Sequence, residues 1–255
     1  DGAPSNTGGR EPEVSAVMTW SALHSFVLGA NFHSGALLVN YLYDDLGLPS
    51  GVYSACPDDA LERQLSLEYA SHNPPMFNST EFNDGITNGA AWYVATGSMQ
   101  DWNYRYLGCI ENTIELYDIS KKPAGTTLPT FWENNRESML AYLEAVHWGV
   151  RGRVTDRVSG APLWARVTVA DNTQPVFTNA ARGDYYRLLL AGTYALTLEA
   201  KGYIPYRVRD VAVPDRGYTR VDAALSNGDV NADGSVNAAD IQATVNALLN
   251  RPGAP

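Results

Sequence analysis

A change in hydrophobic periodicity at Gly149 constrains the fold more than any other feature of the sequence. Before it, apolar residues recur every three or four positions in residues 11–20, 57–72 and 130–147, as in amphipathic helices. After it, as far as Ser226, no helical period is found, and apolar residues alternate with polar ones. The chain therefore joins two architectures, an α/β part at residues 1–148 and a small all-β part at 149–226.

In the α/β part, short apolar runs lie between the helical segments. Residues 25–31, "SFVLGAN", and 109–117, "CIENTIELY", read as strands, so helices and strands alternate as in an α/β layer. Thr130 and Glu133 have the spacing of a capping box. We expect the helices to bury these faces: Val14, Val17 and Met18; Leu61, Leu65 and Tyr69; Leu140, Leu143 and Val146.

In the all-β part, residues 165–171, "ARVTVAD", and 193–200, "TYALTLEA", show the clearest alternation. Glycine, proline and aspartate separate these runs. Several short strands in fewer than 80 residues predict a β-sandwich.

Composition excludes some functions. The formal net charge of −10 argues against nucleic acid or an anionic membrane as a partner. Cys56 and Cys109 do not form a C-x-x-C pair, which argues against a thiolate zinc site. They are either buried free thiols or one disulfide.

Residues 229–240, "DVNADGSVNAAD", have the spacing of a calcium loop that opens a helix. Calcium takes six to eight oxygen ligands, and the expected ligands are Asp229, Asn231, Asp233, Ser235, Asn237 and Asp240, with Gly234 at the sharp turn. The alternative is a plain Asx-rich turn before a helix. Residues 228–250 resemble a single dockerin repeat, so we expect residues 227–255 to form a calcium-binding module. In the dockerin family, two such repeats bind a cohesin-like partner.

Four stretches carry a wider resemblance: "ANFHSGALLVNYLYDD", "NGAAWYVATGSMQDWNY", "CIENTIELY" and "PTFWENNRESMLAYLEAVHWGVRGRV". In this order they resemble the downstream part of a zinc metallocarboxypeptidase catalytic domain of the regulatory group. Residues 149–226 resemble the transthyretin-like sandwich that follows it. The resemblance implies a secreted zinc-dependent enzyme that removes single C-terminal residues from peptides or proteins.

The resemblance also implies roles for individual residues. His33 matches the third zinc ligand, and Glu115 matches the carboxylate that activates water and carries its proton, with Glu111 as a nearby competitor. Tyr93 matches the tyrosine that closes over the substrate. Gln100 matches the floor of the specificity pocket.

Asp44 matches an acidic pocket position in family members that remove lysine or arginine, although Asp45 is adjacent. A carboxylate at the base of the pocket would pair with a cationic side chain. The resemblance therefore implies a preference for basic C-terminal residues.

The family's other two zinc ligands lie in a His-x-x-Glu motif. None of the four histidines, His24, His33, His72 and His147, is followed by glutamate three residues later. We expect these 255 residues to be the downstream part of an enzyme, inactive alone, since a catalytic zinc site needs three protein ligands. The alternative is a non-catalytic peptide-binding protein with a calcium-dependent docking module.

Overall fold

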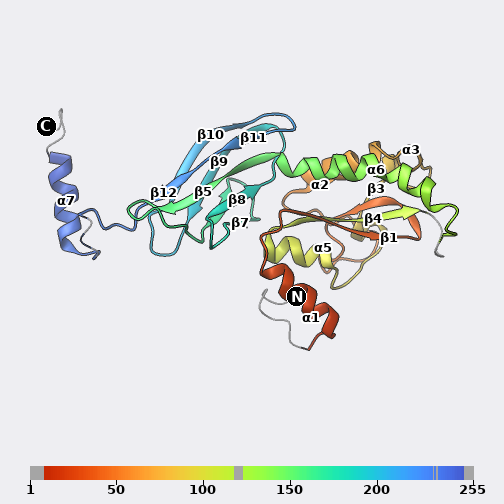
Figure 1. The fold of residues 1–255 in the computed structure, drawn as a ribbon, viewed down its shortest axis with the longest axis horizontal. Coiled ribbons are helices and arrows are strands. Elements are labelled where there is room, and N and C mark those ends of the chain that lie inside the picture. Colours follow the sequence, from red (N-terminus) through yellow and green to blue (C-terminus); the bar gives the residue numbers. More distant parts are fainter. Residues whose placement is uncertain (1–8, 118–122, 232, 234, 250–255) are drawn as a thin grey trace.

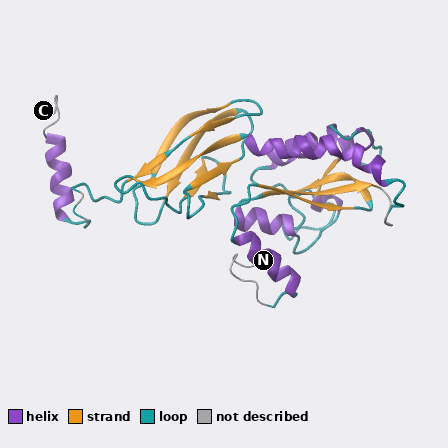
Figure 2. Cartoon of the chain, in the orientation of Figure 1, coloured by secondary structure: helices purple, strands orange, loops and turns teal. Residues whose placement is uncertain are grey.

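The computed structural model describes residues 9–117, 123–231, 233 and 235–249. Three parts follow one another along the chain (Figure 1). A four-stranded sheet with helices on both faces comes first, an all-strand part comes next, and a single helix stands at the C-terminal end. Figure 2 shows the contrast between the mixed first part and the strand-only second part.

The first sheet has the strand order β1-β4-β2-β3. Its strands are β1 (Leu28–His33), β2 (Ala36–Tyr41), β3 (Ile86–Asn88) and β4 (Ile110–Tyr117). β1 runs parallel to β4, β4 runs antiparallel to β2, and β2 runs parallel to β3. Two of the three pairings are parallel and need long crossovers, which the helices provide.

Helices α2 (Asp59–Ser71) and α6 (Leu128–Glu144) cover one face of the sheet, and α1 (Pro12–Ala22) lies on the other side with α5 (Met99–Trp102) (Figure 1). The remaining helical segments are short: α3 (Pro74–Phe77), α4 (Gly89–Trp92), η1 (Asn83–Gly85), η2 (Asn103–Leu107) and η3 (Ala145–His147). No helix among the described residues is long and apolar enough to cross a membrane.

The predicted buried face of α2 is confirmed, because Leu61, Leu65 and Tyr69 are all buried. The prediction for α6 is wrong for Leu140 and Leu143, which are 52% and 63% exposed. The capping-box prediction is also wrong. The helix begins at Leu128, two residues before Thr130, and no side chain caps it.

The face that α6 does bury is polar, and its hydrogen bonds explain the difference. Asn135 Oδ1 accepts a hydrogen bond of 2.9 Å from the Tyr69 hydroxyl. The Tyr142 hydroxyl lies 2.8 Å from the carbonyl oxygen of Gly29 and 3.0 Å from Asn112 Oδ1. Buried polar groups are stable only when paired, so these bonds orient the helix in place of the leucine stripe.

On α1, only part of the predicted face is buried. Met18 is buried, whereas Val14 and Val17 are 43% and 45% exposed. The predicted face therefore remains largely uncovered in this chain.

The all-β part contains two packed sheets. One has the order β10-β9-β6-β7, and the other has the order β11-β5-β12 with β8 paired to β5. The strands are β5 (Gly149–Asp156), β6 (Arg166–Val169), β7 (Val176–Phe177), β8 (Asp184–Arg187), β9 (Gly192–Glu199), β10 (Tyr206–Val213), β11 (Tyr218–Arg220) and β12 (Ala223–Leu225). Ala165, Val167, Val169, Leu196 and Leu198 lie in the core between the sheets, as their alternation predicts.

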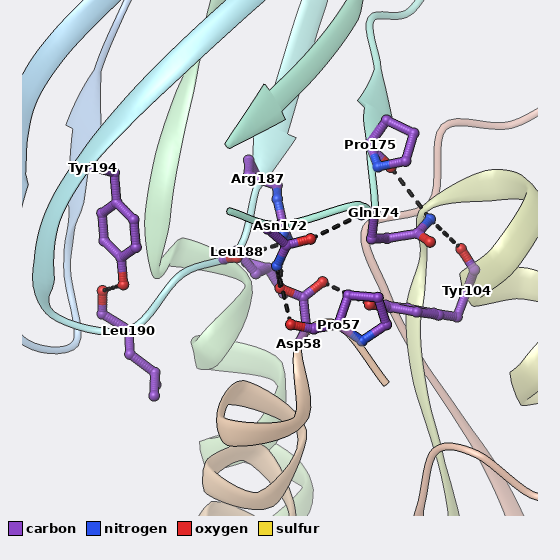
Figure 3. Close-up of polar contacts among 10 residues, drawn as sticks. All are labelled: Pro57, Asp58, Tyr104, Asn172, Gln174, Pro175, Arg187, Leu188, Leu190 and Tyr194. Atoms are coloured by element: carbon purple, nitrogen blue, oxygen red, sulfur yellow. Dashed lines mark hydrogen bonds and ion pairs between the residues drawn. The ribbon is translucent and has the colours of Figure 1, made fainter. Parts of the chain in front are cut away.

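A buried polar cluster joins the first part to the sandwich (Figure 3). Arg187 Nη2 of β8 lies 2.7 Å from Asp58 Oδ1, which precedes α2, and both side chains are almost fully buried. Asn172 donates to the same oxygen at 2.7 Å, and the Tyr104 hydroxyl donates to Asp58 Oδ2 at 2.8 Å. The two parts are therefore held together by paired buried charges as well as by apolar packing.

The tail ends in α7 (Ala238–Leu249), which lies at the end of the chain away from the first sheet (Figure 1). Ile241 is 68% exposed and Val245 is 40% exposed, so the apolar side chains of this helix have few packing partners among the described residues. Cys56 and Cys109 are both buried and free, which resolves the earlier alternative in favour of thiols.

Candidate functional site

The parallel pairing of β1 with β4 places His33 directly beside Glu115. Both residues lie at the carboxyl ends of their strands, where sites in open α/β sheets form. Side chains alternate across a strand, so Glu111, Thr113 and Glu115 share one face of β4. The opposite face of β4 packs against α2 and α6 through Asn112 and the core residues. The site therefore lies on the polar face of the sheet.

Glu115 is 7% exposed, whereas His33 is exposed. Burial raises the pKa of Glu115, and the neighbouring His33 opposes that shift. Glu115 Oε2 is buried and finds no hydrogen-bond partner among the described residues. A buried carboxylate oxygen without a partner costs free energy unless a ligand or another group forms a hydrogen bond or an ion pair with it. This arrangement suits a group that takes up and releases a proton.

Glu111, the alternative carboxylate on the same strand, is occupied by structural contacts. Asn31 Nδ2 donates to its Oε1 at 3.1 Å, and Asn103 Nδ2 donates to its Oε2. These bonds tie Glu111 to β1 and η2, away from the strand end at which His33 and Glu115 meet.

Tyr93 follows α4 and is 49% exposed. Partial burial raises the pKa of its hydroxyl, and the nearby carboxylates of Glu115 and Asp44 raise it further. Tyr93 therefore lies within electrostatic range of both residues, at the open side of the site.

Asp44 and Gln100 are buried together, at 3% and 0% exposure. Burial raises the pKa of Asp44. Hydrogen bonds from Ser98 and Asn40 oppose this shift, as does the nearby Gln100 amide. Asn40 Nδ2 lies 3.0 Å from Asp44 Oδ1. Thr113 donates to Gln100 Oε1 at 2.8 Å. Gln100 Nε2 has no hydrogen bond of standard geometry within the described chain.

Two further residues lie against Asp44, and the sequence analysis did not identify them. A Cβ atom at Gly89 would lie 2.0 Å from Asp44 Oδ1, so only glycine leaves room for the carboxylate. Asp101 accepts hydrogen bonds from the backbone amides of Asp44 and Asp45, each at 3.0 Å. Burial raises the pKa of Asp101 to about 6, although the two amide bonds oppose the shift. The only sequence signal was that both residues lie in the same quoted stretch as Gln100.

The described residues do not form a complete zinc site. They contain no group of three or more histidine, cysteine, aspartate or glutamate side chains that could hold a metal ion. His33 lies beside Glu115, whose Oε2 has no hydrogen-bond partner among the described residues. This pair fits one part of a metal site. One histidine does not satisfy zinc, which takes three protein ligands in catalytic sites.

Hydrogen bonds between residues of the predicted calcium loop hold its conformation. Asp240 Oδ1 accepts from the backbone amide of Val230 at 2.6 Å, and Asp240 Oδ2 accepts from that of Asn237 at 2.8 Å. The backbone amide of Asp233 lies 3.1 Å from Asp229 Oδ1 and 3.0 Å from Asn231 Oδ1. The Ser235 amide donates to Asp233 Oδ1 at 2.9 Å, and the Asn237 side chain accepts from Ala239. These contacts are those of an Asx-rich turn. Gly234 lies outside the described residues.

Comparison with known proteins identifies the family. The family described as "Zinc carboxypeptidase" matches residues 3–138, more than half of the chain, and the "Carboxypeptidase regulatory-like domain" matches residues 149–226. The chain belongs to the zinc carboxypeptidase family.

Several curated relatives match most of this chain. Carboxypeptidase D of Mus musculus is 42% identical over 233 residues, which is 88% of this chain and 17% of the relative. Carboxypeptidase M of Mus musculus is 37% identical over 81% of this chain and 48% of the relative. Carboxypeptidase E of Caenorhabditis elegans is 38% identical over 80% of this chain and 49% of the relative. The chain thus spans less than half the length of each of these relatives.

The similarity of this chain to solved structures is weak. A type II cohesin–X-dockerin complex from Acetivibrio cellulolyticus aligns with a TM-score of 0.25 and 16% identity, covering 38% of this chain and 70% of that chain. A similarity at this level carries no argument for a dockerin module.

Proposed function

We propose that this chain contributes the downstream part of the active site of a secreted zinc carboxypeptidase that removes C-terminal lysine or arginine. The observation that carries the proposal is the β1–β4 register, which sets His33 beside a buried Glu115 with an unpartnered oxygen. Family membership supports the class of reaction.

In this proposal each residue has a distinct task. Glu115 takes a proton from the attacking water and delivers it to the leaving amine, for which a raised pKa is favourable. Tyr93, exposed at the open side, covers the substrate. Asp44 pairs with the cationic side chain of the substrate, and the Gln100 amide, which lies near Asp44, supplies a further donor to the substrate.

We propose that residues outside this sequence complete the zinc site, and the uncovered edge of β1 supports this proposal. β1 is an edge strand among the described strands, and His33 ends it. Phe32 is 48% exposed, and a cavity of about 320 Å³ beside the strand is lined by side chains that include Trp20, Phe26 and Met99. An uncovered edge with apolar flanks favours the addition of another strand. We therefore expect no hydrolysis by these 255 residues alone.

The test uses a fusion protein that contains the missing zinc ligands. In this fusion, the region of mouse carboxypeptidase M that precedes the matched segment is placed before residue 9. The release of arginine or of phenylalanine from the C-terminus of short peptides is then measured in the presence of zinc. We expect the fusion to release arginine. Glu115→Gln should lower kcat by roughly 10²–10⁴-fold, which is the usual contribution of a general acid–base. Asp44→Asn should reduce the preference for arginine over phenylalanine.

Glu111→Gln is the matched control, because this glutamate lies on the same strand but is held by Asn31 and Asn103. It should retain a kcat close to that of the parent fusion. Equal losses from Glu111→Gln and Glu115→Gln would reject the assigned role. Arginine release by the unfused chain would reject the proposed incompleteness.

A second candidate function is peptide binding without cleavage, favoured by the absence of a complete metal cluster among the described residues. A fusion that binds zinc and a peptide ending in arginine but never hydrolyses it would support this alternative.

We also propose that residues 229–240 bind calcium and that the tail serves as a docking module outside the cell, toward a cohesin-like partner where a second repeat is present. The oxygen spacing of the loop supports calcium binding. The carboxylate of Asp233 and the amide oxygen of Asn231 accept hydrogen bonds from backbone amides of the loop, and an ion could replace those amides as their partner.

A further inference from the structure

Charge is distributed unevenly between the two main parts of the chain. Residues 149–226 contain eleven arginines and lysines against seven aspartates and glutamates. Residues 1–148 contain six against eighteen. The sandwich is therefore a cationic module within an anionic chain, and the net charge of −10 conceals this difference.

Part of this positive charge lies on the outer face of β8, β5 and β11. Along β5, Val150 and Val154 point into the core, so Arg151 and Arg153 point outward. The register places Tyr186 of β8 beside Arg151 on one side and Arg220 of β11 beside it on the other. We call the outward side chains Arg151, Arg153, Tyr186, Tyr218 and Arg220 the Arg–Tyr face.

The face also carries two carboxylates, since Asp184 is the register neighbour of Arg153 and Asp222 accepts a hydrogen bond from the Arg153 backbone amide. Arg151 is the central cation for which the described contacts show no carboxylate partner. The guanidinium of Arg151 lies 3.2 Å from the centre of the Tyr218 ring, and Arg153 Nε donates to the carbonyl oxygen of Arg182 at 2.8 Å. Among the described residues, neither Arg151 nor Arg153 forms an ion pair, whereas Arg220 pairs with Asp222 at 2.8 Å. Tyr186 and Tyr218 expose 38% and 45% of their surface.

Arg151 and Arg220 are neighbours in the strand register, although they have the same charge. Like charges directly opposite each other on a sheet destabilise it. Asp222 compensates Arg220 in part, so the charge that an added anion would neutralise is chiefly that of Arg151. Arginine also presents a planar fork of donors that matches the oxygens of sulfate and phosphate.

We propose that the Arg–Tyr face binds a linear sulfated polysaccharide. The guanidinium groups would hold sulfate groups, and the flat face of Tyr186 would pack against a sugar ring, while the Tyr218 ring supports the guanidinium of Arg151. Three neighbouring strands form a strip only about 10 Å wide between their outer axes, which suits a single polymer chain. A bilayer or a nucleic acid duplex presents a broader anionic surface, and the acidic residues of the first part would repel it.

The test measures binding of the full chain to a heparin oligosaccharide by titration calorimetry at about 0.15 M salt, at which surface charges are already screened beyond ~8 Å. The Arg151→Gln/Arg153→Gln double variant should bind at least about tenfold more weakly, because it loses two charge-assisted contacts. Arg151→Lys should lose less, since it keeps the charge and loses the fork.

The control is Arg207→Gln/Arg209→Gln, which makes the same change in net charge on β10 of the other sheet, where both residues are exposed. It should bind within about twofold of the parent chain, because a distant exposed charge is screened. Far-ultraviolet circular dichroism should show the same fold for every variant.

Four results would overturn the proposal. They are the absence of heparin binding by the parent chain, an equal loss in the control variant, equal binding of desulfated heparin, and tighter binding of anionic vesicles or duplex DNA than of heparin.

Discussion

At the scale of single residues, Glu62 is the most unusual group in the first part of the chain. It lies on α2, is fully buried, and neither carboxylate oxygen has a hydrogen-bond partner within the described structure. Burial raises the pKa of Glu62 well above its usual range, and the carboxylate of Asp58 adds to the shift. A group of this kind is neutral in the folded protein over a wide pH range.

We predict that Glu62→Gln stabilises the chain more at pH 7.5 than at pH 5. A raised folded-state pKa means that the folded state binds more protons, so Glu62 stabilises most below its unfolded pKa of about 4.3. Above that value its contribution falls by ~1.4 kcal/mol per pH unit until the folded-state pKa is reached. Glutamine lacks this titration. Urea denaturation at the two pH values measures the difference.

Glu81→Gln is the control for this prediction, because Glu81 is exposed. It should change the unfolding free energy little, and equally at both pH values. If the effect of Glu62→Gln were also the same at pH 5 and pH 7.5, the buried carboxyl would not be titrating as proposed.

At the scale of elements, the loop before α7 is the segment whose order depends most on its own polar side chains. Asp240 accepts hydrogen bonds from the backbone amides of Val230, Asn231 and Asn237, which ties the loop to the start of the helix. The backbone amide of Asn237 is the main cause of the lowered pKa of Asp240. Because α7 exposes Ile241 and Val245, little apolar burial supports it.

We predict that calcium slows amide exchange in residues 229–248 and leaves exchange in the sandwich unchanged. Calcium at millimolar concentration should suffice, because extracellular modules bind it with dissociation constants of about 10⁻⁴–10⁻³ M. Hydrogen exchange with and without a chelator measures the effect. Asp233→Ala should abolish it, whereas Asn246→Ala, on α7 outside the loop, should retain it. Identical exchange with calcium and with chelator would show that the loop is an Asx-rich turn only.

At the scale of the whole molecule, the buried pair of Asp58 and Arg187 joins the two main parts (Figure 3). Asn172 and Tyr104 also donate to Asp58, and Gln174 Nε2 donates to the carbonyl oxygen of Tyr104 at 2.6 Å. Residues from both parts therefore depend on one carboxylate.

We predict that Asp58→Ala lowers the unfolding free energy by about 3–5 kcal/mol, because Arg187 would remain buried without a counter-charge. The Asp58→Asn/Arg187→Met double variant should recover much of that loss, since replacing both charges removes the unpaired one. Chemical denaturation of the single and double variants measures the coupling.

The exposed pair of Arg136 and Glu133 is the matched control, with side chains 44% and 58% exposed. Glu133→Ala should cost less than about 1 kcal/mol, as is usual for exposed ion pairs. A similar cost for Asp58→Ala would mean that the buried cluster does not hold the two parts together.

Local sequence was sufficient for the long helices and for the class of fold, but in the first sheet it predicted β1 and β4 and not β2 and β3. The change of period at Gly149 predicted a mixed part followed by strands, because the spacing of apolar side chains follows directly from helix and strand geometry. The family resemblance singled out His33, Glu115, Asp44 and Gln100 before any contact was known.

Only the tertiary structure decided which elements meet and which faces they bury. Periodicity cannot show that β1 pairs with β4 in the register that joins His33 to Glu115, because that pairing links residues 82 positions apart. It also misplaced Leu140 and Leu143, since the bonds of Asn135 and Tyr142 to other elements orient α6. Gly89 and Asp101 were missed for the same reason. Their roles arise from close contact with Asp44, which exists only once distant segments have packed together.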